Sequence, residues 1–186
     1  HYEAPFIYLL FGLEKALLID TGATEDASVF PLYATVNKIQ KQRAQKLGLS
    51  TSKLPLTVAH SHSHGDHIAG DGQFEGDDKT NLIPPKNLFG LKRAFGIADW
   101  PKQQVKYELG RRSLTVIPSP GHQTEAVIFY DEKNKWLLTG DNVYPGRLYV
   151  REWQTFKDSI ATLAKFSHKH EIKAVLGAHI EMSNNH

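Results

Sequence analysis

The sequence predicts an α/β protein, because short apolar runs and longer amphipathic stretches alternate along it. Several of these runs end at a glycine that is followed closely by His or Asp. Open α/β sheets place their ligands at such carboxyl ends of strands. We therefore expect helices packed on β-sheet, with functional side chains gathered at one edge.

The first half of the chain predicts two strands, a helix and a third strand. Residues 6–11 and 16–20 are the apolar runs that open the chain. Residues 31–46 predict a helix, with a proline in the first turn, an apolar stripe, and Gly48 as the stop. The opposite face of this helix is basic. We interpret it as a solvated surface rather than a groove for an anionic partner.

The middle of the chain, residues 70–101, is the least regular part, because glycine and proline break it into short pieces. We expect a loop-rich insertion beside the site. Its aromatic residues, Phe89, Phe95 and Trp100, either contact substrate or fill a small satellite core, and we favour the core. Four strands, a helix at residues 155–168 and a final strand are expected to follow.

Histidine and aspartate gather in residues 61–67, Ser-His-Ser-His-Gly-Asp-His, which we call the histidine loop. In a strand-to-loop turn, His62 and His64 point the same way and can share one ion. After the glycine the chain can turn and aim Asp66 and His67 at a second position. The alternative is a solvated histidine-rich loop without a ligand.

Three further apolar runs each end near a glycine and one ligand-type residue, namely His122, Asp141 and His179. Taken singly, each is more typical of an ordinary strand end. Taken with the histidine loop, they supply enough nitrogen and oxygen donors for two borderline divalent ions, of which zinc is the leading candidate. His60 would allow a register shifted by two residues, but the Asp-His pair fixes the unshifted one. We therefore interpret His60 as a supporting residue.

Composition fits a compact soluble enzyme. The 186 residues suffice for one domain with a substantial core, expected to span residues 1–186. A formal charge of +2 does not favour a nucleic-acid partner. No apolar run approaches the roughly 20 residues that cross a bilayer, so we expect no membrane association, and the compartment and oligomeric state stay open. The absence of cysteine excludes a disulfide framework and a thiolate ligand or nucleophile.

These motifs resemble the metallo-β-lactamase fold superfamily of metallohydrolases. The signature His-x-His-x-Asp-His stands at residues 62–67, the single His, Asp and His follow in order, and Asp-Thr-Gly at residues 20–22 matches an early family turn. The resemblance covers about residues 7–179. It implies an αββα sandwich of two mixed β-sheets flanked by helices. Against that pattern the chain starts and stops early, so we expect it to be trimmed at both ends.

The resemblance also implies roles for the site residues. One metal would be held by His62, His64 and His122, the other by Asp66, His67 and His179, and Asp141 would bridge both. Asp20 would support the histidine loop from behind. Two divalent ions, zinc or alternatively iron or manganese, would turn a shared water into a hydroxide nucleophile at neutral pH. Asp66 would act as the catalytic residue that positions this hydroxide and passes a proton to the leaving group.

The segment around Asp141 bears on the substrate. Thr-Gly-Asp at residues 139–141 resembles glyoxalase II, lactonases and other ester or thioester hydrolases more than true metallo-β-lactamases. This implies hydrolysis of an ester, thioester or lactone bond in a small-molecule substrate. The residues that follow differ from glyoxalase II, which argues against glutathione thioesters. Tyr144, Arg147 and Tyr149 either line the substrate pocket, through an oxyanion contact or a bound anion, or pack under the loop.

Three alternatives stay open. A sulfur dioxygenase of the same fold would use one iron held by His62, His122 and Asp141, and only the metal identity separates it from a hydrolase. A small phosphodiesterase would use the same two ions. A non-catalytic binding module is disfavoured, because drift would be expected to remove some of the seven ligand-type residues.

Overall fold

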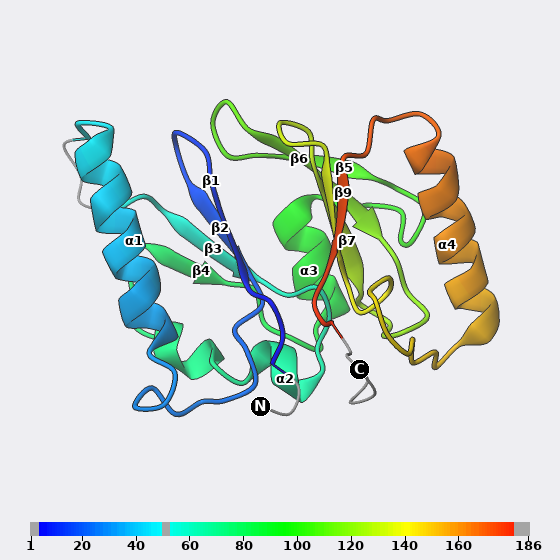
Figure 1. Ribbon diagram of the computed structural model, residues 1–186, viewed down its shortest axis with the longest axis horizontal. Coiled ribbons are helices and arrows are strands. Elements are labelled where there is room, and N and C mark those ends of the chain that lie inside the picture. The colour runs from blue at the N-terminus through cyan, green and yellow to red at the C-terminus, as the bar shows by residue number, and fades with distance from the viewer. Residues whose placement is uncertain (1–3, 50–52, 181–186) are drawn as a thin grey trace, which may run out of the picture.

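The structure, a computed structural model, describes residues 4–49 and 53–180 (Figure 1). The strands are β1 (Tyr8–Phe11), β2 (Ala16–Ile19), β3 (Leu56–Ala59), β4 (Thr80–Leu82), β5 (Val105–Glu108), β6 (Ser113–Pro118), β7 (Val127–Asp131), β8 (Trp136–Gly140) and β9 (Ala174–Gly177). The helices are α1 (Leu32–Lys46), α2 (Gly65–Ile68), α3 (Leu88–Phe95) and α4 (Trp153–Ser167), with a 3-10 helix at Asp71–Phe74.

Within the described residues the strands form two mixed sheets. The first has the order β1-β2-β3-β4, in which β1 is antiparallel to β2 and the other pairs are parallel. The second has the order β5-β6-β7-β8-β9, in which only β8 and β9 are parallel. Figure 1 shows α1 on the outer side of the first sheet and α4 on the outer side of the second. The predicted αββα sandwich is confirmed.

Three apolar clusters join these layers, and strand β2 shows how. Leu17 and Ile19 belong to the cluster between the sheets, whereas Ala16 and Leu18 belong to the cluster under α1. Strand β7 divides its side chains in the same way between the central cluster and the cluster under α4. Successive residues of a strand face opposite sides, so both faces of these strands are buried. This packing brings the edges of the two sheets together.

The strands that lead to the site all run toward the same edge. β2 and β3 are parallel, and Asp20 and the histidine loop follow their carboxyl ends. β6 and β8 are both antiparallel to β7, and β9 is parallel to β8, so these three strands share one direction. His122, Asp141 and His179 follow their carboxyl ends. The topology therefore collects residues from five strand ends in one place.

The two long helices lie close to their predicted positions. The structure has α1 at Leu32–Lys46, against a prediction of residues 31–46, and α4 at Trp153–Ser167, against residues 155–168. Helix ends commonly differ by this much, because the terminal turns fray. Among the described residues, no helix combines the length and the apolar character that a bilayer crossing requires.

The middle of the chain is more regular than the prediction of a loop-rich insertion. It contains strand β4 and helix α3, whose start is capped by the Asn87 side chain accepting from the Gly90 N–H at 2.8 Å. Gly96, with φ +74°, ends the helix in the left-handed conformation that glycine favours. Phe95 is buried in the central core and Trp100 packs against it, whereas Phe89 is 76% exposed. Two of the three aromatic residues, Phe95 and Trp100, therefore have the core role that we favoured. They belong to the main core between the sheets and not to a separate satellite core.

Candidate metal centre

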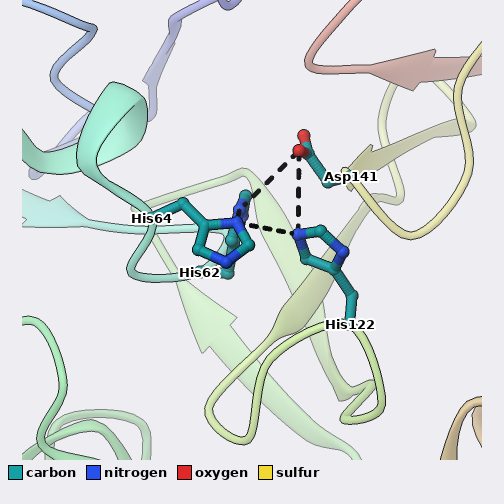
Figure 2. A group of neighbouring side chains, drawn as sticks. All are labelled: His62, His64, His122 and Asp141. Atoms are coloured by element: carbon teal, nitrogen blue, oxygen red, sulfur yellow. Dashed lines mark hydrogen bonds and ion pairs between the residues drawn. The ribbon is translucent and has the colours of Figure 1, made fainter. Parts of the chain in front are cut away.

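Four of the predicted ligands, His62, His64, His122 and Asp141, meet at the shared edge and form what we call the first group (Figure 2). The Nδ1 atom of His64 lies 3.0 Å from His62 Nε2 and 3.1 Å from His122 Nε2. Asp141 Oδ2 lies 3.7 Å from the Nε2 atoms of both His62 and His122. Three imidazole nitrogens and one carboxylate oxygen therefore face a common point.

The ring nitrogens of the first group that face the common point have lone pairs available for a metal ion. His122 Nδ1 donates to the Tyr149 carbonyl at 2.6 Å, so in the neutral ring the inward Nε2 is unprotonated. Burial and the charge of His67 lower the pKa of His62 well below its usual value. Burial and the charge of His122 lower the pKa of His64. Both rings are neutral at pH 7, which is the form that binds a metal ion.

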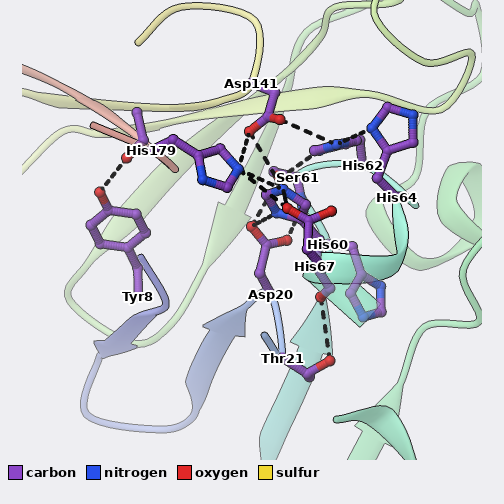
Figure 3. A network of polar contacts seen from close by, with 12 residues as sticks. Tyr8, Asp20, Thr21, His60, Ser61, His62, His64, His67, Asp141 and His179 are labelled. Atoms are coloured by element: carbon purple, nitrogen blue, oxygen red, sulfur yellow. Dashed lines mark hydrogen bonds and ion pairs between the residues drawn. The ribbon is translucent and has the colours of Figure 1, made fainter. Parts of the chain in front are cut away.

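The second group consists of Asp66, His67 and His179. Figure 3 shows His67 and His179 beside the other oxygen of Asp141. The Nε2 atoms of His67 and His179 lie 3.3 Å apart. Asp66 Oδ2 is 3.2 Å from the first and 3.3 Å from the second. Asp141 Oδ1 is 3.4 Å from His67 Nε2 and 3.3 Å from His179 Nε2. Each oxygen of Asp141 thus faces one group.

Protons hold the second group together in the metal-free protein. Burial alone would lower the pKa of His67, but the carboxylates of Asp141, Asp20 and Asp66 outweigh it and raise this pKa to about 12. Asp141 and Asp66 also raise the pKa of His179 to about 9, against the effect of burial. Burial would raise the pKa of Asp66 and Asp141, yet His179 and His67 hold both well below the usual range. Two imidazolium rings are therefore paired with ionised carboxylates at pH 7.

Asp20 ties the histidine loop to the second group. Its Oδ1 accepts from the Ser61 backbone N–H at 2.7 Å, and its Oδ2 accepts from the Ser61 hydroxyl at 2.9 Å and from His67 Nδ1 at 2.9 Å. Ligand histidines commonly donate their second nitrogen to such a carboxylate, which fixes the ring and its tautomer. Asp20 is 1% exposed, so it acts from behind the site and does not reach solvent.

A glycine lets the two halves of the site approach each other. Gly140 has φ +53°, and a Cβ atom at this position would meet the Ser61 Cβ at 2.7 Å. Any larger residue would push Asp141, the next residue, away from the histidine loop. The close contact between the ends of β3 and β8 therefore depends on the missing side chain.

The donor set fits divalent metal ions. Within each group, one ligand atom per residue lies within 4.8 Å of all the others. Asp141 Oδ1 is buried and has no hydrogen-bond partner, although two imidazole nitrogens lie within ion-pair distance. A buried carboxylate oxygen without a hydrogen bond is costly unless a cation faces it. In the metal-free protein the two imidazolium rings are those cations, and a metal ion would take the place of their protons. Imidazole and carboxylate ligands of this kind suit zinc and similar borderline ions.

The predicted substrate contacts lie beside the site with different exposures. Tyr144 is buried, its hydroxyl donates to the Arg147 carbonyl, and its ring lies 5.6 Å from the ring of His179. Arg147 is exposed, and Tyr149 is 59% exposed. The contact of Tyr149 with the site runs through its backbone carbonyl to His122. The role of these three residues in substrate binding stays a prediction.

The sequence analysis did not identify several contacts that support the ligands. Ser61 binds Asp20 through both its backbone and its hydroxyl. The Ser63 hydroxyl donates to Glu125, a residue of the loop that carries His122. The Tyr149 carbonyl orients His122, and backbone groups leave no trace in a side-chain pattern. Only Ser61 had a possible signal, because a small polar residue directly precedes the first ligand.

A comparison with protein families agrees with the fold. The family model described as Metallo-beta-lactamase superfamily matches residues 3–173. The chain belongs to this superfamily. A solved metallo-beta-lactamase of the superfamily, from Pontibacter korlensis, aligns with a TM-score of 0.63 at 16% identity and covers 95% of this chain and 80% of its own. The structure of ETHE1 from Myxococcus xanthus aligns with a TM-score of 0.61 at 18% identity over 99% of this chain and 73% of its own. At these identities the likeness concerns the fold alone.

Relatives within the superfamily are closer in sequence. A protein named hydroxyacylglutathione hydrolase from Bdellovibrio bacteriovorus is 30% identical over 171 residues, which cover 88% of this chain and 60% of the relative. The human protein named acyl-coenzyme A thioesterase MBLAC2 is 25% identical over 169 residues, which cover 76% of this chain and 59% of the relative. The chain therefore spans about 60% of the length of these relatives.

Proposed function

We propose that this protein is a metal-dependent hydrolase that cleaves an ester, thioester or lactone bond, with two divalent ions held by the first and second groups. The observation that carries the proposal is the position of Asp141, whose two oxygens each face one group. A carboxylate so placed suits a bridging ligand. The names of the two relatives, one a glutathione thioester hydrolase and one a coenzyme A thioesterase, support this class of bond.

The two ions would supply a hydroxide at neutral pH and would polarise the carbonyl oxygen of the substrate. The protein's own residues decide where that chemistry happens. His62, His67 and His122 are buried, whereas His64, Asp66 and His179 are partly exposed. The partly exposed members mark the side from which a substrate reaches the site.

Asp66 is the residue proposed to move the proton. Its carboxylate is half-buried beside His67 and His179, and a carboxylate at the solvent side of a site is ionised at neutral pH. An ionised carboxylate at the solvent side can accept a proton from the attacking water and deliver it to the leaving oxygen or sulfur. His67 and His122 keep fixed orientations through Asp20 and the Tyr149 carbonyl, so the ring nitrogens need not reorganise during the reaction.

The test is a hydrolysis assay with the zinc-loaded protein. The panel contains p-nitrophenyl acetate, S-lactoylglutathione, a short acyl-coenzyme A and an acyl-homoserine lactone. We expect turnover of at least one, and a loss of about 100-fold or more in kcat for Asp66→Ala, because general acid–base catalysis contributes 10²–10⁴-fold. Asp158→Ala is the matched control, since it removes an exposed aspartate from α4.

Two results would contradict the proposal. One is a protein that carries two zinc ions and cleaves none of the four substrates. The other is a protein that purifies with about one iron ion and consumes oxygen with a sulfur substrate, which would assign it to the dioxygenase alternative.

A further inference from the structure

His60 and Asp71 flank the histidine loop and bind each other across its base. His60 Nε2 lies 2.8 Å from Asp71 Oδ1. His60 is buried, at 4% exposed, and belongs to neither group of predicted ligands in the described residues. The same Asp71 oxygen accepts from the Thr21 hydroxyl at 2.8 Å. The mechanism proposed above uses none of these three side chains.

Thr21 carries the contact on to the second group. Its backbone N–H donates to the His67 carbonyl at 2.7 Å, while its hydroxyl holds Asp71. The backbones of Thr21 and Gly70 also pack closely, because a Cβ atom at Gly70 would meet the Thr21 carbonyl oxygen at 2.5 Å. Asp71, Thr21 and His67 are therefore one connected unit, and His60 is its link to β3.

The two ends of the histidine loop are anchored unequally. At the first end, Ser61 binds Asp20, and its carbonyl accepts from the Val127 N–H of β7 at 2.9 Å. His62 is thus fixed by backbone contacts to both sheets. At the other end, Asp66 and His67 lie in α2, a helix of four residues that is held through the contacts of His67 with Asp20 and Thr21 and of Ala69 with Gly22. So short a helix has no stability of its own and depends on tertiary contacts.

We propose that His60 and Asp71 are positioning residues that set the affinity for the second metal ion and leave the first unchanged. Because β3 is paired on both sides, His60 is the fixed partner and Asp71 the one that is held. Without their contact Asp71 keeps the Thr21 hydroxyl, but the chain after α2 is held less firmly, and with it the orientation of Asp66 and His67. The His62 end keeps its own anchors. This inference rests on the proposed two-metal site but not on the substrate.

The test is a zinc titration of the metal-free protein against a chromophoric chelator. Wild-type protein should take up two ions in two resolved steps. We expect His60→Phe, which keeps the ring volume but removes the donor, to weaken the second step about 10- to 100-fold, as lost supporting contacts do at metal sites. The first step should stay within about twofold. His60→Gln retains an N–H in a similar position and should restore most of the second affinity.

The control removes a buried hydrogen bond elsewhere on β3. The hydroxyls of Thr57 and Tyr107 lie 2.8 Å apart, so Tyr107→Phe deletes one contact of the same strand and should leave both steps unchanged. Asp71→Ala repeats the test should His60→Phe fail to fold.

Equal weakening of both steps, the same loss in Tyr107→Phe, or no change in His60→Phe and Asp71→Ala would each overturn the inference. Wild-type protein that binds fewer than two zinc ions would instead overturn the proposed function, and this inference with it.

Discussion

The first group consists of three imidazoles that share one carboxylate, whereas the second places two imidazoles among three carboxylates. Burial dominates in the first group and lowers the pKa of His62 and His64. Carboxylates dominate in the second and raise the pKa of His67 to about 12 and that of His179 to about 9. Without metal, the first group is therefore ready for a cation, and the second already holds two protons in its place.

This difference shows how a site built from similar residues on both sides can fill in order. A metal ion that enters the first group competes with few protons, because the pKa values of His62 and His64 are lowered. An ion that enters the second group must displace the protons of His67 and His179, and it gains the carboxylates that those protons had neutralised. Asp141 belongs to both sides, so it couples them.

The largest expected effect is that of Asp141→Ala, which removes what the two groups share. The variant should lose the second ion and reduce turnover by about 100-fold or more, since even supporting residues cost 10- to 100-fold at metal sites. Elemental analysis and the hydrolysis assay measure both effects. A variant that keeps two ions and full turnover would show that the groups do not depend on this carboxylate.

The next effect is on pH dependence. Raising the pH removes the protons of His67 and His179, so the apparent affinity for the second ion should rise by about 100-fold per pH unit between pH 7 and 9. Above pH 9 only His67 still releases a proton, and the rise should fall to about 10-fold per unit. The affinity for the first ion should change little above pH 7. Calorimetric titrations in buffers of different ionisation heat measure the number of protons released with each ion. Equal proton release in both steps would show that the two groups do not differ in protonation.

Asp20→Asn should act mainly on the second group, because the amide oxygen of asparagine can still accept from the Ser61 backbone N–H that Asp20 Oδ1 binds. Asparagine keeps the size of the side chain and tolerates the positive φ of 68° at this position. It removes the charge that holds His67 Nδ1 at 2.9 Å. We expect about 10-fold weaker binding of the second ion. The pKa of His67 should fall, because a carboxylate that raises it is gone. Zinc titration together with NMR of the His67 ring protons measures both, and a loss confined to the first ion would contradict the assignment.

The smallest effect is expected for Tyr149→Ser. The contact of Tyr149 with His122 runs through the backbone carbonyl, which the substitution retains. Affinity for the first ion should therefore stay within about twofold. A larger change in KM than in metal affinity would support the predicted contact between the Tyr149 side chain and substrate.

The sequence predicted the elements that have a repeated apolar pattern. It did not predict those whose formation depends on a few tertiary contacts. The strands buried on both faces gave continuous apolar runs, and α1 and α4 had clear stripes. Helix α3 was missed, because Gly90 lies inside it and two prolines precede it, although Asn87 and Gly96 have the residue types of its caps. A short helix between breakers does not stand out from a loop until its packing against the core is known.

The site shows the same division. The order of ligand-type residues implied the two groups through resemblance to a family, and the structure brings those residues together. The contact between His60 and Asp71 could not be foreseen, since it depends on how the chain returns after the histidine loop. The Tyr149 carbonyl was equally hidden, because every residue has one.

Diffraction from crystals of the zinc-loaded protein, measured at the zinc absorption edge, would show directly whether the two groups hold two ions. We expect two anomalous peaks about 3.5–4 Å apart. One should lie about 2.0–2.1 Å from the inward nitrogens of His62, His64 and His122. The other should lie among Asp66, His67 and His179, with Asp141 between the two. A single peak, or a second peak away from these residues, would contradict a hydrolase with two metal ions.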